Sequence, residues 1–276
     1  MEDDPVFRTD LYRGTAGDYD RFRIGYPPSL FDDLLTLAEV GGRGRALDLA
    51  CGTGQISFAL QARFDEVWAV DQEPDMVACV RAKAAAASVS NVVAVAAAAE
   101  ELVAPEGAFE LVAIGNAFHR LPRRAVAARA LRWLAPDRCL ALLWGGSPWR
   151  GAAPWQRAMD DTMARWSAMV RDRTRVPPTY ERVRSARPDL AILEEAGFTL
   201  LGTLRASLDH AWTCEELIGF VYSTSVLSRL VLGDLAGPFE DDLARSLLAC
   251  EPSGVFAQEI TFAAEVARTP VHDQAT

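Results

Sequence analysis

The stretch ALDLACGTGQ, residues 46–55, joins a short apolar run to two glycines that are one residue apart. The run predicts a buried strand, and the spacing of Phe58, Leu60 and Ala62 predicts a helix directly after it. Glycines at such a turn let a ligand approach the backbone, and the helix directs unpaired N–H groups toward that ligand. The sequence therefore predicts a binding site at a strand–turn–helix unit.

The same alternation of strand and helix continues up to Gly145. Apolar runs predict further strands at residues 66–70, 91–95, 109–115 and 139–145. Helices are expected from Pro74 to Lys83 and from about Pro122 to Leu134. Strands that alternate with helices imply a parallel sheet with right-handed crossovers and helices on both faces. We therefore expect an α/β fold with a Rossmann-like, doubly wound sheet.

After Gly145 the alternation breaks. Residues 146–186 are too long and too aromatic for an ordinary loop, so they are expected to form a helical cap over the substrate. Residues 199–210 and 256–267 predict late strands, one of them antiparallel, and a second helical segment is expected at about 212–250. The predicted organisation is N-terminal helices and cofactor-binding core at 1–145, cap at 146–186, the rest of the core at 187–268 and a disordered tail at 269–276.

Bulk composition restricts the function. No apolar run is long enough to span a bilayer, and the acidic start MEDDPVFRTD is unlike a secretory signal, so we expect a cytoplasmic protein. Five scattered cysteines argue for reduced thiols and against a disulfide framework or a zinc site. A net charge of −10 disfavours nucleic acid and suits a cationic substrate. The sequence indicates no metal, and it leaves the oligomeric state open.

The spacing of acids around the glycine turn separates two cofactor classes. Asp71 ends the second strand seventeen residues after Gly54, where a carboxylate can accept both hydroxyls of a ribose. A dinucleotide fingerprint needs a third glycine, but that position holds Ser57. Asp48 precedes the turn, where it would repel a pyrophosphate but attract an ammonium group. These residues favour a nucleoside with an amino-acid tail over a dinucleotide.

At this point a family resemblance is clear. LDLACGTGQ resembles motif I of class I S-adenosylmethionine-dependent methyltransferases, commonly LDLGCGTG, and VDQEPDMV, GNAFHRLP and LAPDRCLALLW resemble later motifs of that family. The lead-in YRGTAGDYDRFRIGYPPSLFDDL is similar to the N-terminal segment of its small-molecule branch, the UbiE-like and methyltransferase-11/25 groups. The resemblance covers residues 12–145 and implies S-adenosylmethionine as cofactor and S-adenosylhomocysteine as product.

The resemblance also implies roles for single residues. Gly52 and Gly54 would lie against the homocysteine part, Asp71 would hold the ribose, and Gln72 and Met76 would lie at the adenosine. The other residues expected at the cofactor are Tyr12, Tyr19, Arg23, Asp48, Gln55, Ala99, Glu100 and Asn116. Arg23 suits the cofactor carboxylate, and Asn116 would offer carbonyls near the amino group or the methyl. The usual adenine-binding acid is replaced by Ala98, which leaves Glu100 as a substitute.

Candidates for the chemistry are few. His119 follows the fourth strand and is expected to act in catalysis or in orienting the substrate, while Arg120 stands where the family usually has an aromatic residue. The substrate is expected to contact Trp149, Asp160 and Tyr222.

Three functions stay open. The leading prediction is methyl transfer to nitrogen or oxygen of a small bacterial natural product, such as an amino sugar or aminoglycoside in antibiotic biosynthesis. The alternatives are C- or O-methylation of an aromatic or polyketide metabolite, and a protein that binds the cofactor without transferring methyl groups.

Overall fold

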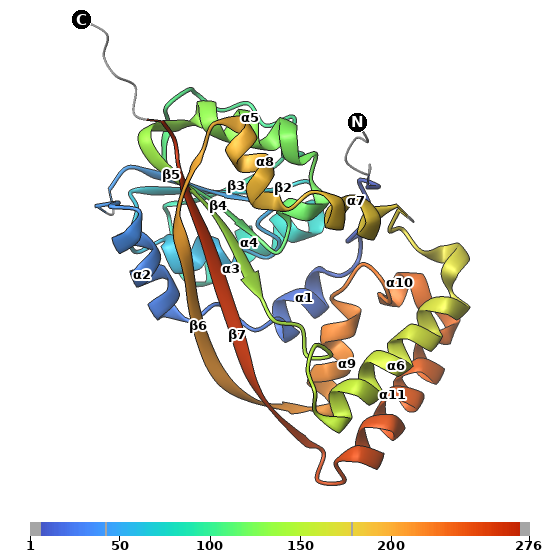
Figure 1. Cartoon of the computed structure of the whole chain (residues 1–276). Helices are drawn as coiled ribbons and strands as arrows, with labels where there is room; N and C mark the ends of the chain where they lie inside the picture. Colours follow the sequence, from blue (N-terminus) through green and yellow to red (C-terminus); the bar gives the residue numbers. More distant parts are fainter. Residues whose placement is uncertain (1–6, 42, 178, 271–276) are drawn as a thin grey trace, which may run out of the picture.

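The computed structural model describes residues 7–41, 43–177 and 179–270, and its centre is a seven-stranded sheet (Figure 1). The strands are β1 (Arg45–Leu49), β2 (Glu66–Asp71), β3 (Val92–Ala96), β4 (Phe109–Gly115), β5 (Leu134–Gly145), β6 (Thr199–Thr213) and β7 (Val255–Arg268). Their order is β3-β2-β1-β4-β5-β7-β6. The first five are parallel neighbours, and β7 runs antiparallel between β5 and β6. The predicted Rossmann-like sheet with a late antiparallel strand is confirmed.

Helices cover both faces of the sheet. They are α1 (Ala16–Phe22), α2 (Pro28–Leu37), α3 (Gln55–Leu60), α4 (Pro74–Ala86), η1 (Phe118–Arg120), α5 (Arg123–Trp133), α6 (Pro154–Met169), η2 (Arg171–Arg173), α7 (Tyr180–Ala186), α8 (Asp189–Ala196), α9 (Cys214–Tyr222), α10 (Arg229–Leu232), η3 (Gly233–Leu235) and α11 (Ala236–Cys250). One buried cluster packs α2 and α3 against the sheet, and the other packs α5 and α8 against the opposite face. Burial on both faces explains why the parallel strands are apolar throughout rather than alternating. Among the described residues, no helix combines the length and apolarity that crossing a membrane requires.

Strand β5 is longer than predicted. It begins at Leu134 rather than Cys139, because Leu134 already pairs with Phe109 before the register shifts and Leu111 pairs with Cys139. Asp137 takes a left-handed φ of 62° inside this irregular start. Residues Ala135, Pro136 and Asp137, which directly follow the predicted helix, therefore lie within the strand.

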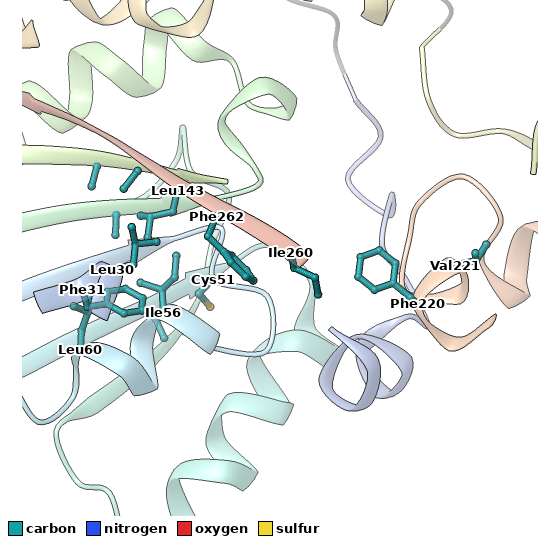
Figure 2. Packing of buried hydrophobic residues seen from close by; sticks show 14 of the residues in the cluster. Leu30, Phe31, Cys51, Ile56, Leu60, Leu143, Phe220, Val221, Ile260 and Phe262 are labelled. Carbon is teal, nitrogen blue, oxygen red and sulfur yellow. The ribbon is translucent and has the colours of Figure 1, made fainter. Parts of the chain in front are cut away.

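The cap comprises residues 146–186 together with helices α9 to α11, and the two longest strands, β6 and β7, carry it. Residues 262–268 of β7 pair with β5, whereas residues 255–261 pair only with β6, so the two strands leave the sheet as a ribbon (Figure 1). Helices α9 to α11 connect the far end of this ribbon, and α6 packs on α11. Because a lone hairpin is only marginally stable, side chains on the ribbon must bury against the cap. Figure 2 shows this continuity, from Leu30 and Phe31 beneath the sheet, along Phe262 and Ile260 of β7, to Phe220 of α9.

Two described residues, Thr269 and Pro270, follow strand β7. Thr269 follows β7, and its backbone N–H donates to the carbonyl of Arg138 at 2.9 Å. The other part of the predicted tail, residues 271–276, lies outside the described residues.

Candidate active site

The glycine turn after β1 is built from left-handed backbone. Ala50, Gly52 and Gly54 have φ values of 56°, 55° and 86°. A Cβ added to Gly52 would lie 3.4 Å from the Tyr19 ring, which is van der Waals contact, so it is the left-handed φ that favours glycine at this position. Gly54 caps the start of α3, and its N–H donates to the Cys51 carbonyl at 2.9 Å. This geometry turns the chain sharply at the carboxyl end of β1 and exposes its backbone to a cavity.

Asp71 joins this turn to the end of β2. One carboxylate oxygen accepts the backbone N–H of Gly52 at 2.8 Å, and the other accepts the N–H of Glu73 at 2.9 Å. Burial raises the pKa of Asp71, and these backbone donors oppose that rise. A carboxylate offers about four acceptor positions, so two remain for other donors. Asp71 is thus held in one orientation with capacity for the two hydroxyls of a ribose.

A narrow cavity of about 90 Å³ lies over Asp71 and Gly52. Its walls are Phe7, Leu11, Tyr12, Tyr19, Ala50, Gly52, Asp71, Gln72, Glu73, Met76, Ala97, Ala99, Gly115, Asn116, Ala117, Arg120 and Leu121. Apolar side chains such as Met76 suit a purine ring, Asp71 suits a ribose, and the bare backbone of Gly52 suits a close-lying tail. These residues fit a nucleoside with an amino-acid tail, which is the form of S-adenosylmethionine.

Several residues predicted at the cofactor lie on this cavity. They are Tyr12, Tyr19, Gly52, Asp71, Gln72, Met76, Ala99 and Asn116. Others lie elsewhere. Gln55 donates its side-chain amide to the Arg23 carbonyl at 3.0 Å, and Glu100 is exposed on a turn. A Cβ added to Gly54 would point toward Phe58, and Gly54 does not line the cavity.

Asp48 is buried beneath the turn and lines neither this cavity nor the larger one described below. Its Oδ2 accepts the N–H of Ser57 at 2.8 Å and the hydroxyl of Ser57 at 2.5 Å, while Oδ1 has no partner in the described part of the chain. Burial raises the pKa of Asp48 to about 7, and the bonds from Ser57 oppose that rise. Asp48 therefore fixes the first turn of α3, and the structure gives it no direct path to a ligand ammonium group.

A second, larger cavity adjoins the first and lies under the cap. This chamber has a volume of about 630 Å³. Four residues line both cavities and define their junction, namely Tyr12, Tyr19, Asn116 and Arg120. A ligand in the narrow cavity and a molecule in the chamber would therefore meet at the carboxyl end of β4.

Asn116 shapes this junction through backbone strain. It has a left-handed φ of 51°, a conformation that asparagine tolerates better than most residues. Its Oδ1 accepts the N–H of Gly145 at 3.1 Å, and its Nδ2 donates to the Tyr26 hydroxyl at 3.1 Å. The side-chain carbonyl that was expected to face the cofactor is thus already bonded to β5.

Arg23 lies on the chamber wall rather than on the narrow cavity. Helix α1 ends at Phe22, and Arg23 has extended backbone. Its Nε donates to the Ser223 hydroxyl at 2.7 Å, and its guanidinium lies 4.9 Å from the Tyr19 ring and 4.3 Å from the Phe220 ring. Neutral and aromatic groups therefore fix the position of this charge.

His119 lies on the chamber wall between two aromatic side chains. Its ring stacks on Trp144 at 5.3 Å and lies 5.8 Å from Tyr180. Burial, with smaller contributions from Arg120, Arg184 and Arg123, lowers the pKa of His119 to about 2. The imidazole is neutral near pH 7 and is a weak proton acceptor, so it is better suited to orienting a bound molecule by hydrogen bonding.

Two of the three residues predicted to contact the substrate line the chamber, and the third does not. Trp149 and Asp160 line the chamber, whereas Tyr222 is fully buried on α9 and donates its hydroxyl to Glu240 at 2.8 Å. The structure does not bring Tyr222 to the chamber, because its side chain packs toward α11. Two wall residues that the sequence did not indicate are Trp144 and Tyr180. Trp144 stands near the carboxyl end of β5, a position that could have indicated it.

The described residues contain no group of three or more His, Cys, Asp or Glu side chains placed to hold a metal ion.

Comparisons with known proteins identify the family to which the chain belongs. Residues 46–137 match the family described as a methyltransferase domain. Uncharacterized methyltransferases of Mycobacterium tuberculosis and Mycobacterium bovis are each 32% identical over 174 residues, which is 63% of this chain and 67% of theirs.

Two solved structures share the fold. A structure from Anaeromyxobacter dehalogenans, described as a candidate type II methyltransferase, has a TM-score of 0.64 at 21% identity and covers 91% of this chain and 98% of its own. The cyclase SpnF has a TM-score of 0.53 at 18% identity, with coverage of 90% and 85%. The glycine turn, the carboxylate at the end of β2 and the mycobacterial relatives together place this chain among the class I S-adenosylmethionine-dependent methyltransferases.

Proposed function

We propose that this enzyme transfers a methyl group to a nitrogen or oxygen atom of a small molecule bound in the chamber. The observation that carries the proposal is the junction of the two cavities at Tyr12, Tyr19, Asn116 and Arg120. It brings a site suited to S-adenosylmethionine into contact with a separate space of about 630 Å³. A pocket of that size suits a small organic molecule.

In this proposal the narrow cavity holds the cofactor. Asp71 binds the ribose, the turn at Gly52 leaves room for the tail, and Met76 packs on the base. Arg23, at the edge of the chamber, binds the carboxylate. When bound, S-adenosylmethionine supplies a methyl group that an acceptor atom attacks in line, forming a bond to carbon as the carbon–sulfur bond breaks and the acceptor loses a proton.

The chain's own contribution is then to hold the acceptor and exclude water. The aromatic side chains of Trp144, Trp149 and Tyr180 wall the chamber. Neutral His119 orients the acceptor by a hydrogen bond, and the proton that the acceptor loses on methylation is released to bulk solvent. Positioning of this kind accounts for much of the rate enhancement when two reactants must meet in line.

The nature of the acceptor is a separate question. The prediction of an amino sugar or aminoglycoside is based on the net charge of −10 and on the tryptophans of the cap. Asp160 is the one carboxylate on the chamber wall among the described residues and would support an amine there. The rest of the lining does not support it, since the other ionic groups are arginines.

The experiment begins with calorimetric titration of S-adenosylmethionine, S-adenosylhomocysteine and NAD. We expect micromolar binding of the first two, no binding of NAD, and at least a tenfold loss in Asp71→Asn. Asp33→Asn, which removes an exposed carboxylate from α2, is the matched control. Turnover is then measured as S-adenosylhomocysteine release with panels of amines, alcohols and acids. Binding of NAD alone would refute the cofactor site. Cofactor binding with no methylated product from any panel would refute methyl transfer to nitrogen or oxygen.

A further inference from the structure

The charges inside the chamber are opposite in sign to the charge of the whole chain. Five ionic side chains line it, four of them positive and one negative, namely Arg23, Arg120, Arg150, Arg184 and Asp160. The chain as a whole has 38 acidic and 28 basic residues. The excess of arginine is therefore a property of this cavity and does not reflect the composition.

These arginines also differ from others in the chain in what they contact. Arg45 pairs with Glu66 at 2.9 Å and Arg165 with Asp242 at 3.1 Å, as is common on the surface. Within the described residues, none of the four chamber arginines forms an ion pair with a carboxylate. Three of the four donate hydrogen bonds to neutral hydroxyl oxygens. Arg120 donates to the Ser225 hydroxyl at 2.9 Å, and the other donors are Arg23 to Ser223 and Arg184 to Tyr180.

Arg120 is the one of these four arginines that lies at the junction of the two cavities. It lines both cavities, and its guanidinium lies 5.4 Å from the Tyr12 ring and 6.0 Å from the Tyr180 ring. Its Nε is shielded from solvent and has no hydrogen-bond partner in the described part of the chain. Aromatic walls exclude water, and an arginine held there attracts an anion more strongly than one in solvent. Its planar guanidinium can bind a carboxylate or phosphate through two parallel bonds.

We infer that the acceptor is a small organic acid, and that Arg120 binds its carboxylate or phosphate at the junction while Arg150 and Arg184 attract the same group from the cap side. This inference rests on the proposed function and names the substrate class. Arg23 is left for the cofactor carboxylate. Anchoring the anion at Arg120 holds the rest of the acceptor within reach of the end of β4, where the methyl group would be presented.

The test compares three probes of similar size and different charge. Benzoate, benzamide and benzylamine are titrated into the enzyme saturated with S-adenosylhomocysteine, and phenyl phosphate is added to separate phosphate from carboxylate. We expect the anions to bind at least tenfold more tightly than benzamide, and benzylamine to bind no better than benzamide. Arg120→Gln should remove the preference. Arg132→Gln, which removes an exposed arginine of α5, should preserve it.

Each outcome is decisive. Equal binding of the three charge types, a preference for benzylamine, or no anion binding at millimolar concentration would overturn the inference. Retention of the anion preference in Arg120→Gln would overturn the role of Arg120. The affinity for S-adenosylhomocysteine is measured first in every variant. Failure of the unmodified protein to bind S-adenosylhomocysteine would count against the proposed function. Binding of S-adenosylhomocysteine without an anion preference would count only against an organic acid as acceptor.

Discussion

The buried carboxyl of Asp48 makes a quantitative prediction about stability and pH. In the folded protein its pKa is raised from 3.8 to about 7, chiefly because it is removed from water. The folded state therefore keeps a proton that the unfolded chain has already released. This group's contribution to stability is fully present below pH 3.8 and declines as the pH rises toward about 7. The full shift corresponds to about 4 kcal/mol of lost stability.

The perturbation is Asp48→Asn, which cannot ionise. The amide oxygen can still accept from Ser57, and its NH₂ group would take the place of the unpartnered Oδ1. That unpartnered donor destabilises the variant by a constant amount of about 1–3 kcal/mol, so the informative quantity is the change with pH. Between about pH 5 and pH 8.5 the stability of the variant relative to the unmodified protein should rise by about 3 kcal/mol.

The assay is thermal unfolding of both proteins over this pH range. For a chain of this size about 1 kcal/mol moves Tm by about 2 °C, so the difference in Tm should change by about 6 °C. Ser57→Ala should extend the decline of the otherwise unmodified protein to higher pH, because the lost hydroxyl opposes the rise in the pKa of Asp48. Asp33→Asn controls for the loss of one charge. A difference in Tm that stays constant from about pH 5 to pH 8.5 would show that Asp48 is ionised in the folded protein. The two hydrogen bonds from Ser57 would then outweigh the effect of burial on its pKa.

Three further substitutions test the turn, the cap and the histidine. Gly52→Ala should destabilise the fold by about 1–2 kcal/mol and weaken S-adenosylhomocysteine binding in calorimetry, because φ is left-handed and the new Cβ meets the Tyr19 ring. Trp166→Phe should lower stability by at least about 1 kcal/mol in thermal unfolding without changing cofactor affinity, since it removes the bond from the indole N–H to Asp242 on α11 and leaves part of a buried space unfilled. His119→Gln should leave the pH dependence of kcat/KM between about pH 5 and 8 unchanged, because a side chain with a pKa of about 2 does not titrate there. NMR shifts of the His119 ring that titrate in this range would contradict the last prediction.

The cofactor half of the molecule could be predicted from the sequence because its signals are local. An apolar run, two glycines and an acid after the next apolar run predict a strand, a turn and the position expected for the ligand within residues 46–71. Ala50 shows the limit of this local information. It carries a left-handed φ of 56°, where the commonly seen motif has glycine, and no periodicity reveals that strain.

The cap half could not be predicted to the same depth, since its contacts connect distant segments. Periodicity shows that Phe220 and Tyr222 lie on a helix, but not which of them faces α6, α11 or the chamber. In the structure Tyr222 bonds to Glu240 of α11 and Phe220 packs on Arg23. The spacing of Tyr19, Phe22 and Tyr26 is near-helical, yet α1 stops at Phe22, and this frees Arg23 to reach Ser223 across 200 residues of sequence.

The chamber wall is positively charged although the chain as a whole is negative, so the net charge of the chain is a poor guide to the substrate. The arginines on its wall come from four separate segments, after α1, within η1, after β5 and on α7, so no single stretch of sequence reveals the charge of the wall. The excess of acids governs solubility and long-range repulsion, which salt screens over about 8–10 Å. A ligand inside the chamber interacts at shorter range with arginines that no carboxylate of the described residues neutralises. An organic acid would thus approach a repelling surface but bind in an attracting cavity, and for the choice of acceptor the attraction at contact distance matters more.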